Sequence, residues 1–312
     1  MAIQNVHWPV LPLDQWQDTY HTLHLWSQIV GKIRLSQMPW INHSWHVPFY
    51  VTARGLTTSL IPYGSGAFEI DFDFSVHRLH ITTSEGEQRS FALKAMSVAD
   101  FYRKMMRSLG ELDIKARIRP MPVEIPDPIQ SFSENEAHAS YDPEAAGRYW
   151  RALLQVQRVF TDFRARFIGK VSPVHLFWGA FDLAVTRFSG RSAPKHPGGA
   201  PNCPDWVMQE AYSHEVSSAG FWPGAGLGEA AFYAYAYPEP RGFSEYPVRP
   251  EAAYYHKELG EFILPYQAVR TADEPDTLLL DFLQSTYEAA AELAGWDRIA
   301  LERRKPHPGG FT

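Results

Sequence analysis

The sequence has very little cysteine and no long apolar segment. Cys203 is the only cysteine in the 312 residues, which excludes an intrachain disulfide and is typical of a reducing compartment. No apolar run approaches the roughly 20 residues that span a bilayer. Residues 1–12 also lack the basic and apolar segments of a secretory signal peptide. We therefore expect a cytoplasmic protein with no membrane partner.

Several signatures of common functional classes are absent as well. The chain contains no glycine-rich dinucleotide fingerprint, no Walker motif and no Gly-x-Ser-x-Gly elbow. The formal net charge is −6 and no basic stripe with interleaved aromatic residues occurs, so a nucleic-acid partner is not expected. Cys203 has no histidine beside it, which makes it a weak candidate for a catalytic nucleophile.

What the sequence does contain is a large apolar and aromatic fraction. Hydrophobic residues make up 45% and charged residues 21%, which is typical of a globular protein with a sizeable core. Aromatic residues make up 14% and include ten tryptophans, which mostly pack in cores but also line pockets and interfaces. Thirteen histidines are an excess for this length and add many groups that titrate near neutral pH.

The first half of the chain is expected to run helix, strands, helix. A helix is predicted over residues 13–35, with Trp16 and Trp26 on its apolar face and His24 and Gln28 on its polar face. The strands and the closing helix expected after it are 46–54, 57–63, 67–74, 77–83, 89–94 and 98–112.

The second half is expected to repeat this order. Asp142 and Pro143 are typical of an N-cap and a first helical residue, and they predict a helix that ends near residue 167. The strands and the last helix expected after it are 174–188, 210–221, 230–237, 261–269 and 276–294. This order predicts an α+β fold with antiparallel sheets and flanking helices.

The two halves also share a local motif. In each, a helical run is followed by a glycine and a lysine, Gly31–Lys32 and Gly169–Lys170, and then by a strand. In each case the glycine is a candidate helix C-cap. We interpret the pattern as an internal duplication that gives two similar halves, 1–128 and 129–312, within one compact unit. The alternative is that a glycine and a lysine follow two unrelated helices by chance.

Pairs of histidines raise the question of a metal site. The spacing His-x-x-His occurs at His21 and His24, at His43 and His46, and at His77 and His80. Residues three apart share a face on a helix but not on a strand, so the first pair could converge and the third does not. A divalent transition metal would be held by His24 with His43 and His46, because imidazole suits zinc, iron, manganese or copper. The alternative is that all are surface or capping histidines, since no His-Glu-x-x-His signature occurs.

The segment Ser172–Arg191 places a carboxylate among aromatic residues. Read as a single strand, it has His175 and Arg187 on an apolar core face and Trp178 and Asp182 on the opposite face, towards a cavity or solvent. A carboxylate in such a strand must be paired or hydrogen-bonded. The candidate partners are Arg187, Arg191 and Lys170. The alternative to a functional carboxylate is a structural ion pair.

A second polar strand is expected over 210–221. His214 is an acid/base candidate because its charge changes near neutral pH. Tyr212 lies on the same face of this strand, and Glu215 lies on the other. Trp222 follows in a turn that could wall a ligand site. The alternative is a hydrogen-bonded structural histidine beside a packed loop.

Three segments carry a resemblance to a known family, and they are Leu23–Lys32, Ser172–Gly179 and Glu210–Ser218. They resemble the bacterial family of domain of unknown function 5996 (DUF5996). The resemblance extends from Trp8 to about Glu302, which implies that the chain is a single family unit. It implies no activity, fold or cofactor.

The leading hypothesis is a small-molecule enzyme with a pocket lined by His, Asp and Arg between the two halves. The expected catalytic residues are His175, Asp182, His214 and Glu215. The expected ligand-binding residues, which include basic groups for an anionic substrate, are Lys32, Arg54, Lys170, Trp178, Arg187, Arg191, Tyr212 and Trp222. The alternative is a non-enzymatic module that binds a ligand or a partner protein. Substrate and oligomeric state do not follow from the sequence.

Overall fold

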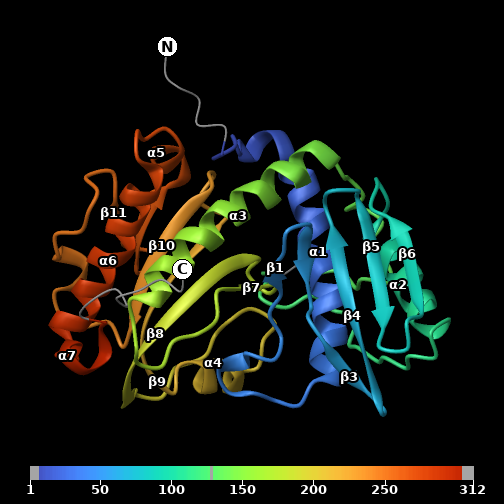
Figure 1. Cartoon of the computed structure of the whole chain (residues 1–312), viewed down its shortest axis with the longest axis horizontal. Helices are drawn as coiled ribbons and strands as arrows, with labels where there is room; N and C mark the ends of the chain where they lie inside the picture. The colour runs from blue at the N-terminus through green and yellow to red at the C-terminus, as the bar shows by residue number, and fades with distance from the viewer. Residues whose placement is uncertain (1–6, 127–128, 304–312) are drawn as a thin grey trace, which may run out of the picture.

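The computed structural model describes residues 7–126 and 129–303, which form two antiparallel β-sheets with helices between and around them (Figure 1). The fold class is therefore α+β, as predicted. The main hydrophobic core continues through both halves. No helix in the described ranges combines the length and the apolar character needed to cross a bilayer.

The first sheet has six strands in the order β1-β2-β4-β5-β6, and β3 pairs with β4. Its strands are β1 (Tyr50–Val51), β2 (Gly55–Thr57), β3 (Ile61–Tyr63), β4 (Gly66–Asp73), β5 (Arg78–Thr83) and β6 (Gln88–Ala92). In β4 the side chains of Phe68, Ile70 and Phe72 are buried, whereas Glu69 and Asp71 keep partial exposure. The alternation read from the sequence is confirmed there.

Helix α1 (Leu13–Gln37) runs between the two sheets (Figure 1). On one side Trp26 stacks on Phe101 of helix α2 (Val98–Gly110), with ring centroids 4.8 Å apart. On the other side His24 and Gln28 are buried as well, because the second half of the chain covers them. The boundaries expected for α1 were nearly correct, but its polar face is exposed only near its N-terminal end, at residues such as Asp14 and Gln17. The short helix η1 (Asn42–Ser44) follows α1.

The second sheet also has six strands, in the order β11-β12-β10-β9-β8-β7. Its strands are β7 (His175–Phe177), β8 (Asp182–Ser192), β9 (His214–Trp222), β10 (Ala231–Tyr237), β11 (Tyr254–His256) and β12 (Glu261–Pro265). The helices of this half are α3 (Pro143–Ala165), α4 (Asp205–Ala211), η2 (Phe243–Glu245), α5 (Tyr266–Arg270), α6 (Pro275–Leu293) and α7 (Arg298–Leu301).

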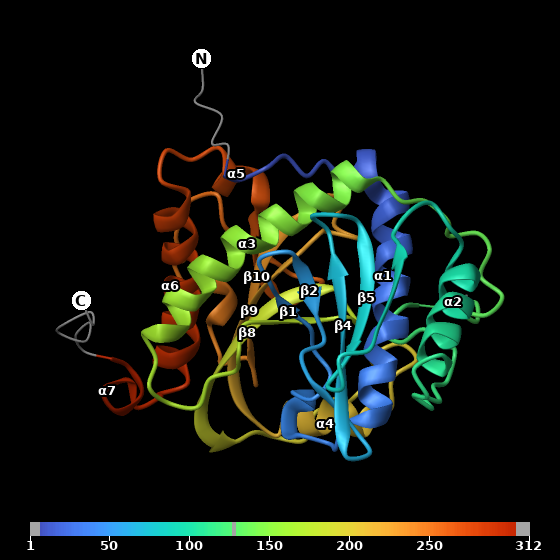
Figure 2. The ribbon, with the colours of Figure 1, turned by 45° about the vertical axis from the view of Figure 1, so that its right-hand side comes forward.

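Helix α3 joins the two halves, since it contacts α1 and β1 on one side and β8 and α6 on the other (Figure 2). It begins as predicted, because the Asp142 side chain accepts a hydrogen bond of 2.9 Å from the amide of Glu144 and Pro143 is the first helical residue. The two sheets also meet directly. The backbones of Phe49 and Leu176 exchange two hydrogen bonds of 2.8 Å.

Several expected strands differ from the structure. Only Tyr50–Val51 of 46–54 forms a strand, 57–63 is divided between β2 and β3, and the strand expected over 261–269 ends at Pro265, where α5 begins. Two further differences affect the site. Residues 174–188 form a hairpin instead of one strand, because Phe181 adopts a left-handed φ of 61° in a turn between β7 and β8. The turn pairs His175 with Ala184, so His175 points to the same face of the sheet as Asp182, and the expected separation of the two was wrong. The strand expected over 210–221 begins only at His214, because α4 precedes it.

The internal duplication is not confirmed. Both halves run helix, strands, helix, but the strand orders of the two sheets differ. Lys32 lies inside α1, whereas Lys170 follows the end of α3. Neither Gly31 nor Gly169 has the positive φ of a C-cap glycine, so the predicted capping role was wrong. Gly31 instead gives room to Trp178, whose Nε1 would lie 2.2 Å from an added Cβ.

Candidate functional site

A cavity of about 1670 Å³ lies between α1, residues 119–126 and 129–130 of the connection, and one face of the second sheet. The sheet contributes every second residue of its central strands, and these are Asp182, Ala184, Thr186, Phe188, Val216, Ser218, Tyr233 and Tyr235. Small residues in the middle of this face leave the space open. The larger aromatic side chains around it include Tyr20, Trp178, Tyr212 and Trp222.

Asp182 is the first residue of β8 and lies on the sheet face that forms the cavity. Its side chain is buried and accepts a hydrogen bond from the hydroxyl of Tyr233. Burial raises the pKa of Asp182 from 3.8 to about 6, and the Tyr233 hydrogen bond opposes that shift. No basic side chain in the described ranges forms an ion pair with it. Asp182 therefore exchanges its proton near neutral pH.

Two further acids, Glu124 and Glu261, line the same cavity. Burial and then the negative charge of Asp182 raise the pKa of each to about 7. The Glu124 carboxylate lies against Gly179 in the β7–β8 turn, where an added Cβ would come within 2.1 Å of its Oε1. Because an ionised Asp182 disfavours ionisation of both glutamates, the three carboxyl groups do not all ionise freely near pH 7.

Sequence reasoning missed both glutamates. Glu124 belongs to the proline-rich connection that was read only as a link between halves, and it has a left-handed φ of 58°. Its amide donates to the carbonyl of Pro201 at 2.7 Å, a contact between distant segments. Glu261 is the first residue of β12 and precedes a buried apolar run. A carboxylate at the start of such a strand is a feature by which the sequence could have indicated Glu261. No comparable feature marks Glu124.

Helix α1 holds the wall of the cavity through His24 and Gln28. His24 Nε2 lies 2.8 Å from the carbonyl oxygen of Gly179 and 3.0 Å from that of Trp178, so this nitrogen carries the proton and donates. Gln28 binds both backbone groups of Val123, at 2.9 and 2.8 Å. Burial lowers the pKa of His24 to about 4, so the ring stays neutral. Both side chains position backbone segments that carry cavity residues.

A basic group faces the cavity further along α1. Lys32 is only 7% exposed and lines the cavity together with Arg119 and Cys203. Burial, and secondarily the charge of Arg119, lowers the pKa of Lys32 to about 8. Burial also raises the pKa of Cys203 to about 11, which keeps it a thiol. Arg119 was not singled out from the sequence.

The cavity reaches the protein surface beside two tryptophans. Trp40 and Trp206 line it and are 40% and 51% exposed, with ring centroids 4.7 Å apart. Trp40 Nε1 donates to Glu210 at 2.8 Å. Because Trp40 follows the C-terminal end of α1, this opening is nearer to Lys32 than to Asp182.

Several predicted site residues form a separate cluster at η1. Lys170 donates to Nε2 of His43 at 2.6 Å, and Nδ1 of His43 then carries the proton that it donates to Ala211 at 3.0 Å. The His214 ring lies 5.9 Å from that of His43, and its Nδ1 contacts Ser213. Of this cluster, His43 borders the cavity, whereas Lys170 and His214 do not line it.

The expected basic partners of Asp182 are all elsewhere. Arg187 points to the opposite side of the sheet, where its guanidinium lies 3.5 Å from the ring centre of Phe163, and burial lowers its pKa to about 9. Arg191 is exposed and binds Glu215 at 2.9 and 2.7 Å, which removes both from the site. Alternation along β8 places the side chains of Arg187 and Asp182 on opposite faces.

Two other predicted residues are also outside the cavity. His175 is buried among aromatic rings, including Trp45 and Phe177, and burial lowers its pKa to about 3, so it remains neutral. Arg54 pairs with Asp73 at the edge of the first sheet. A catalytic role for His175 and a ligand-binding role for Arg54 therefore have no geometric basis.

Three predicted aromatic residues do line the cavity. Trp178 covers Gly31 and donates to the carbonyl of Val47 at 3.0 Å. The Tyr212 hydroxyl is 2.7 Å from that of Tyr235. Trp222 lies at the end of β9 beside Tyr233, with ring centroids 6.2 Å apart.

The three histidines expected to bind a metal are not brought together. His24 bonds to the β7–β8 turn, His43 to Lys170 and Ala211, and His46 to the backbone of Ile41. In the part of the chain that the structure describes, no group of three or more His, Cys, Asp or Glu side chains has a geometry suited to a metal ion. Each of the three rings instead makes its own local contact, and Nε2 of His46 has no hydrogen-bond partner among the described residues.

Comparison with known proteins gives a family but no function. The family model of DUF5996, a family of unknown function, matches residues 8–303. The chain belongs to this family. No curated protein and no solved structure shows significant similarity to it. The match covers α1, both sheets and the connection between them, so all the cavity elements belong to the family unit.

Proposed function

We propose that this member of DUF5996 is an enzyme that acts on a small organic molecule in the cavity, with Asp182 as the proton-transferring group. The observation that carries the proposal is the buried carboxyl of Asp182 on the cavity face of β8, bound to a tyrosine hydroxyl and without a cationic partner in the described ranges. A general acid or base works best when its pKa lies near the working pH. Acids with strongly perturbed pKa values in a concave site are candidates for functional residues, because such values cluster at functional sites.

The neighbouring acids extend this chemistry. Because the negative charge of Asp182, with burial, raises the pKa of Glu124 and of Glu261 to about 7 while that of Asp182 is about 6, a glutamate retains a proton where Asp182 is ionised. Such a set supplies both a proton donor and a proton acceptor to a bound molecule. The surrounding tyrosine and tryptophan rings provide the apolar contacts by which small-molecule sites bury most of a ligand.

The cavity volume bears on the size of the substrate. Typical ligand pockets measure roughly 300–1,000 Å³, and this one, at about 1670 Å³, is larger. It would accept a molecule with several rings, or a substrate together with a second reactant. The alternative function, binding without reaction, predicts the same cavity but no dependence of turnover on Asp182.

The test incubates the purified protein with defined mixtures of cellular metabolites and follows each compound by mass spectrometry. We expect the wild type to bind and consume a compound, and Asp182→Asn to bind that compound in native mass spectra while its consumption falls at least about a hundredfold. Asp162→Asn is the matched control, because Asp162 is an exposed carboxylate on α3 that pairs with Arg166.

Three outcomes separate the alternatives. Equal consumption by Asp182→Asn would contradict the role of Asp182. Binding to both proteins without any consumption would favour the non-enzymatic module. Loss of turnover in Asp162→Asn as well would show that the assay responds to general damage.

A further inference from the structure

The charges that line the cavity have opposite signs at its two ends. Lys32 is buried, faces the cavity and makes no hydrogen bond or ion pair within the described ranges. Arg119 lines the cavity close enough for its charge to act on Lys32, and it too has no carboxylate partner among the described residues. Arg119 is exposed, whereas Lys32 is buried, and a buried cation beside a second positive charge is unfavourable unless an anion pairs with it.

Asp182 is well separated from this basic end, whereas Glu124 lies nearer to it, since the charges of Glu124 and Lys32 both act on Cys203. Asp182 acts electrostatically on Tyr20, which marks the position of the acid along α1. Lys32 follows Tyr20 by twelve residues, which corresponds to about 18 Å along the helix at 1.5 Å per residue. A ligand that reaches both ends is therefore elongated.

The position of the solvent opening also indicates how a ligand would be oriented in the cavity. Trp40 and Trp206 border the opening beyond the C-terminal end of α1, on the side of Lys32. A positive charge near the mouth of a cavity attracts anions, and negative charge deeper inside repels them. An anionic ligand group would therefore stop at the basic end instead of passing to Asp182.

From these observations we propose that Lys32 and Arg119 bind an anionic oxygen group, a carboxylate or a phosphate, at one end of an elongated substrate whose other end faces Asp182. The inference rests on the proposed function, because it uses the same cavity. It adds the chemical class of the substrate and its orientation. The apolar middle of the substrate lies against the aromatic side chains between the two ends.

The test uses a pair of fluorescent probes that differ by one charge. Anilinonaphthalene sulfonate carries an anionic group on an aromatic frame, and phenylnaphthylamine is the same frame without it. We expect both probes to bind the wild type. In Lys32→Met the affinity for the sulfonate falls at least about tenfold, the value of a hydrogen bond to a charged group, and the affinity for the neutral probe is unchanged.

Three variants control for indirect effects. Lys170→Met removes a lysine that binds His43 and does not line the cavity, so it leaves both affinities unchanged. Arg119→Met tests the same anion site from another segment and is expected to act like Lys32→Met. Lys32→Arg keeps the charge and is expected to keep most of the sulfonate affinity. Thermal melting verifies that each variant is folded.

Competition then identifies the anion. Naphthoate, naphthyl phosphate and neutral naphthol displace the sulfonate probe to different extents, and the more effective anion distinguishes a carboxylate substrate from a phosphate substrate. Equal binding of the sulfonate to wild type and Lys32→Met would overturn the anion site but leave the cavity as a ligand site. An equal loss of both probes in Lys32→Met would overturn it too, as general damage. Failure of both probes to bind the wild type would contradict this inference and the proposed function together.

Discussion

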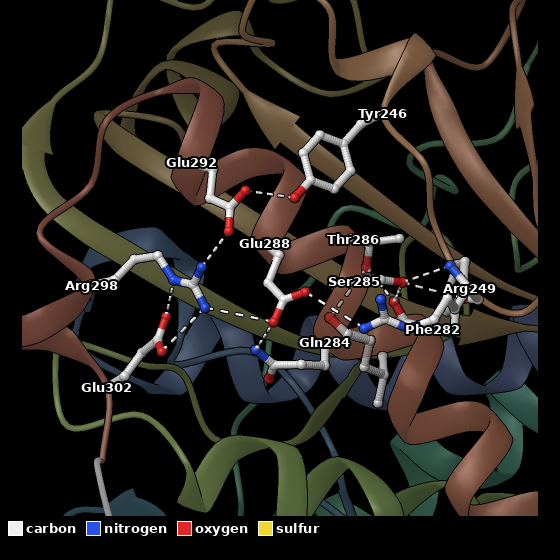
Figure 3. Close-up of polar contacts among 11 residues, drawn as sticks. Tyr246, Arg249, Phe282, Gln284, Ser285, Thr286, Glu288, Glu292, Arg298 and Glu302 are labelled. Carbon is white, nitrogen blue, oxygen red and sulfur yellow. Dashed lines mark hydrogen bonds and ion pairs between the residues drawn. The ribbon is translucent and has the colours of Figure 1, made fainter.

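On the outer surface of α6 and α7, Arg298 binds the carboxylates of Glu288, Glu292 and Glu302, and Tyr246 adds a hydrogen bond to Glu292 (Figure 3). In the cavity, Asp182 has a tyrosine hydroxyl as its partner, and Lys32 has no partner in the described part of the chain. This half-buried surface network thus pairs its charges, and the cavity does not.

The contrast between paired surface charges and unpaired cavity charges indicates where a ligand binds. Exposed charges cost little when unpaired, because water solvates them. Buried charges are unfavourable unless they are paired, so stability alone would select paired or apolar side chains in the cavity. The buried Lys32, which has no partner among the described residues, and the buried Asp182, which has no cationic partner there, fit a ligand that supplies the missing partners.

The largest effect is expected at Asp182, where replacing the buried acid should make the protein more stable. Asp182 binds its proton more tightly in the folded protein, where its pKa is about 6, than in the unfolded chain, where it is 3.8. The free energy of unfolding therefore decreases as pH rises from about 4 to about 6, and it stays lower above that range. The loss is about 3 kcal/mol, since one pKa unit corresponds to about 1.4 kcal/mol.

Asp182→Asn removes this cost. We expect the variant and the wild type to be similarly stable near pH 4, and the variant to be more stable at about pH 8, as measured by urea unfolding at each pH. Parallel stability curves across this range would show that Asp182 is solvated or paired in solution.

A second prediction concerns the packing of Trp178 against Gly31 in the cavity wall. Gly31→Ala places a Cβ 2.2 Å from the Trp178 indole, which is held by its hydrogen bond to Val47. We expect a loss of about 1–3 kcal/mol from overpacking. Gly147→Ala in α3 is the matched control, because an added Cβ there meets no atom within 4 Å. It is expected to stabilise by about 0.5–1 kcal/mol. Equal melting temperatures for both variants would mean that Trp178 moves aside freely.

The smallest effect is expected on the exposed surface. Arg298→Met removes three carboxylate contacts, yet we expect a loss of only about 1 kcal/mol, because exposed ion pairs are weak. The loss should shrink further in about 1 M salt, which screens such pairs. Chemical unfolding at low and high salt measures both. A loss that exceeds that of Gly31→Ala and ignores salt would mean that the network is part of the core.

The parts of the fold that were predicted correctly depend on neighbours in sequence. The alternation of Phe68, Ile70 and Phe72 in β4, and the start of α3 at Pro143, follow from side-chain periodicity and from capping. The hairpin around Phe181 was missed although Gly179 lies in its turn, because the residue with the left-handed φ is a phenylalanine, which rarely adopts that conformation. The polar stripe of α1 was misjudged, because a second half of the chain covers it.

Only part of the candidate site could be predicted from the sequence. Asp182 was singled out because a carboxylate within an aromatic strand needs a partner, and it does line the cavity. Its partner, Tyr233, lies 51 residues away, and no sequence pattern connects them. The histidines drew attention by their number, yet His175 is packed among aromatic rings and His24 binds backbone carbonyls.

The sequence by itself determined the α+β class, the position of most helices and strands, and the presence of an unusual acid in β8. These follow from periodicity, capping and composition, which act over a few residues. Only the tertiary structure decided that Glu124, Glu261 and Lys32 share one cavity with Asp182, and that Arg187 and Arg191 do not. Burial and charge act through space, so groups from distant segments, such as His24 and Gly179, which are 155 residues apart, set the geometry and the pKa values of the site.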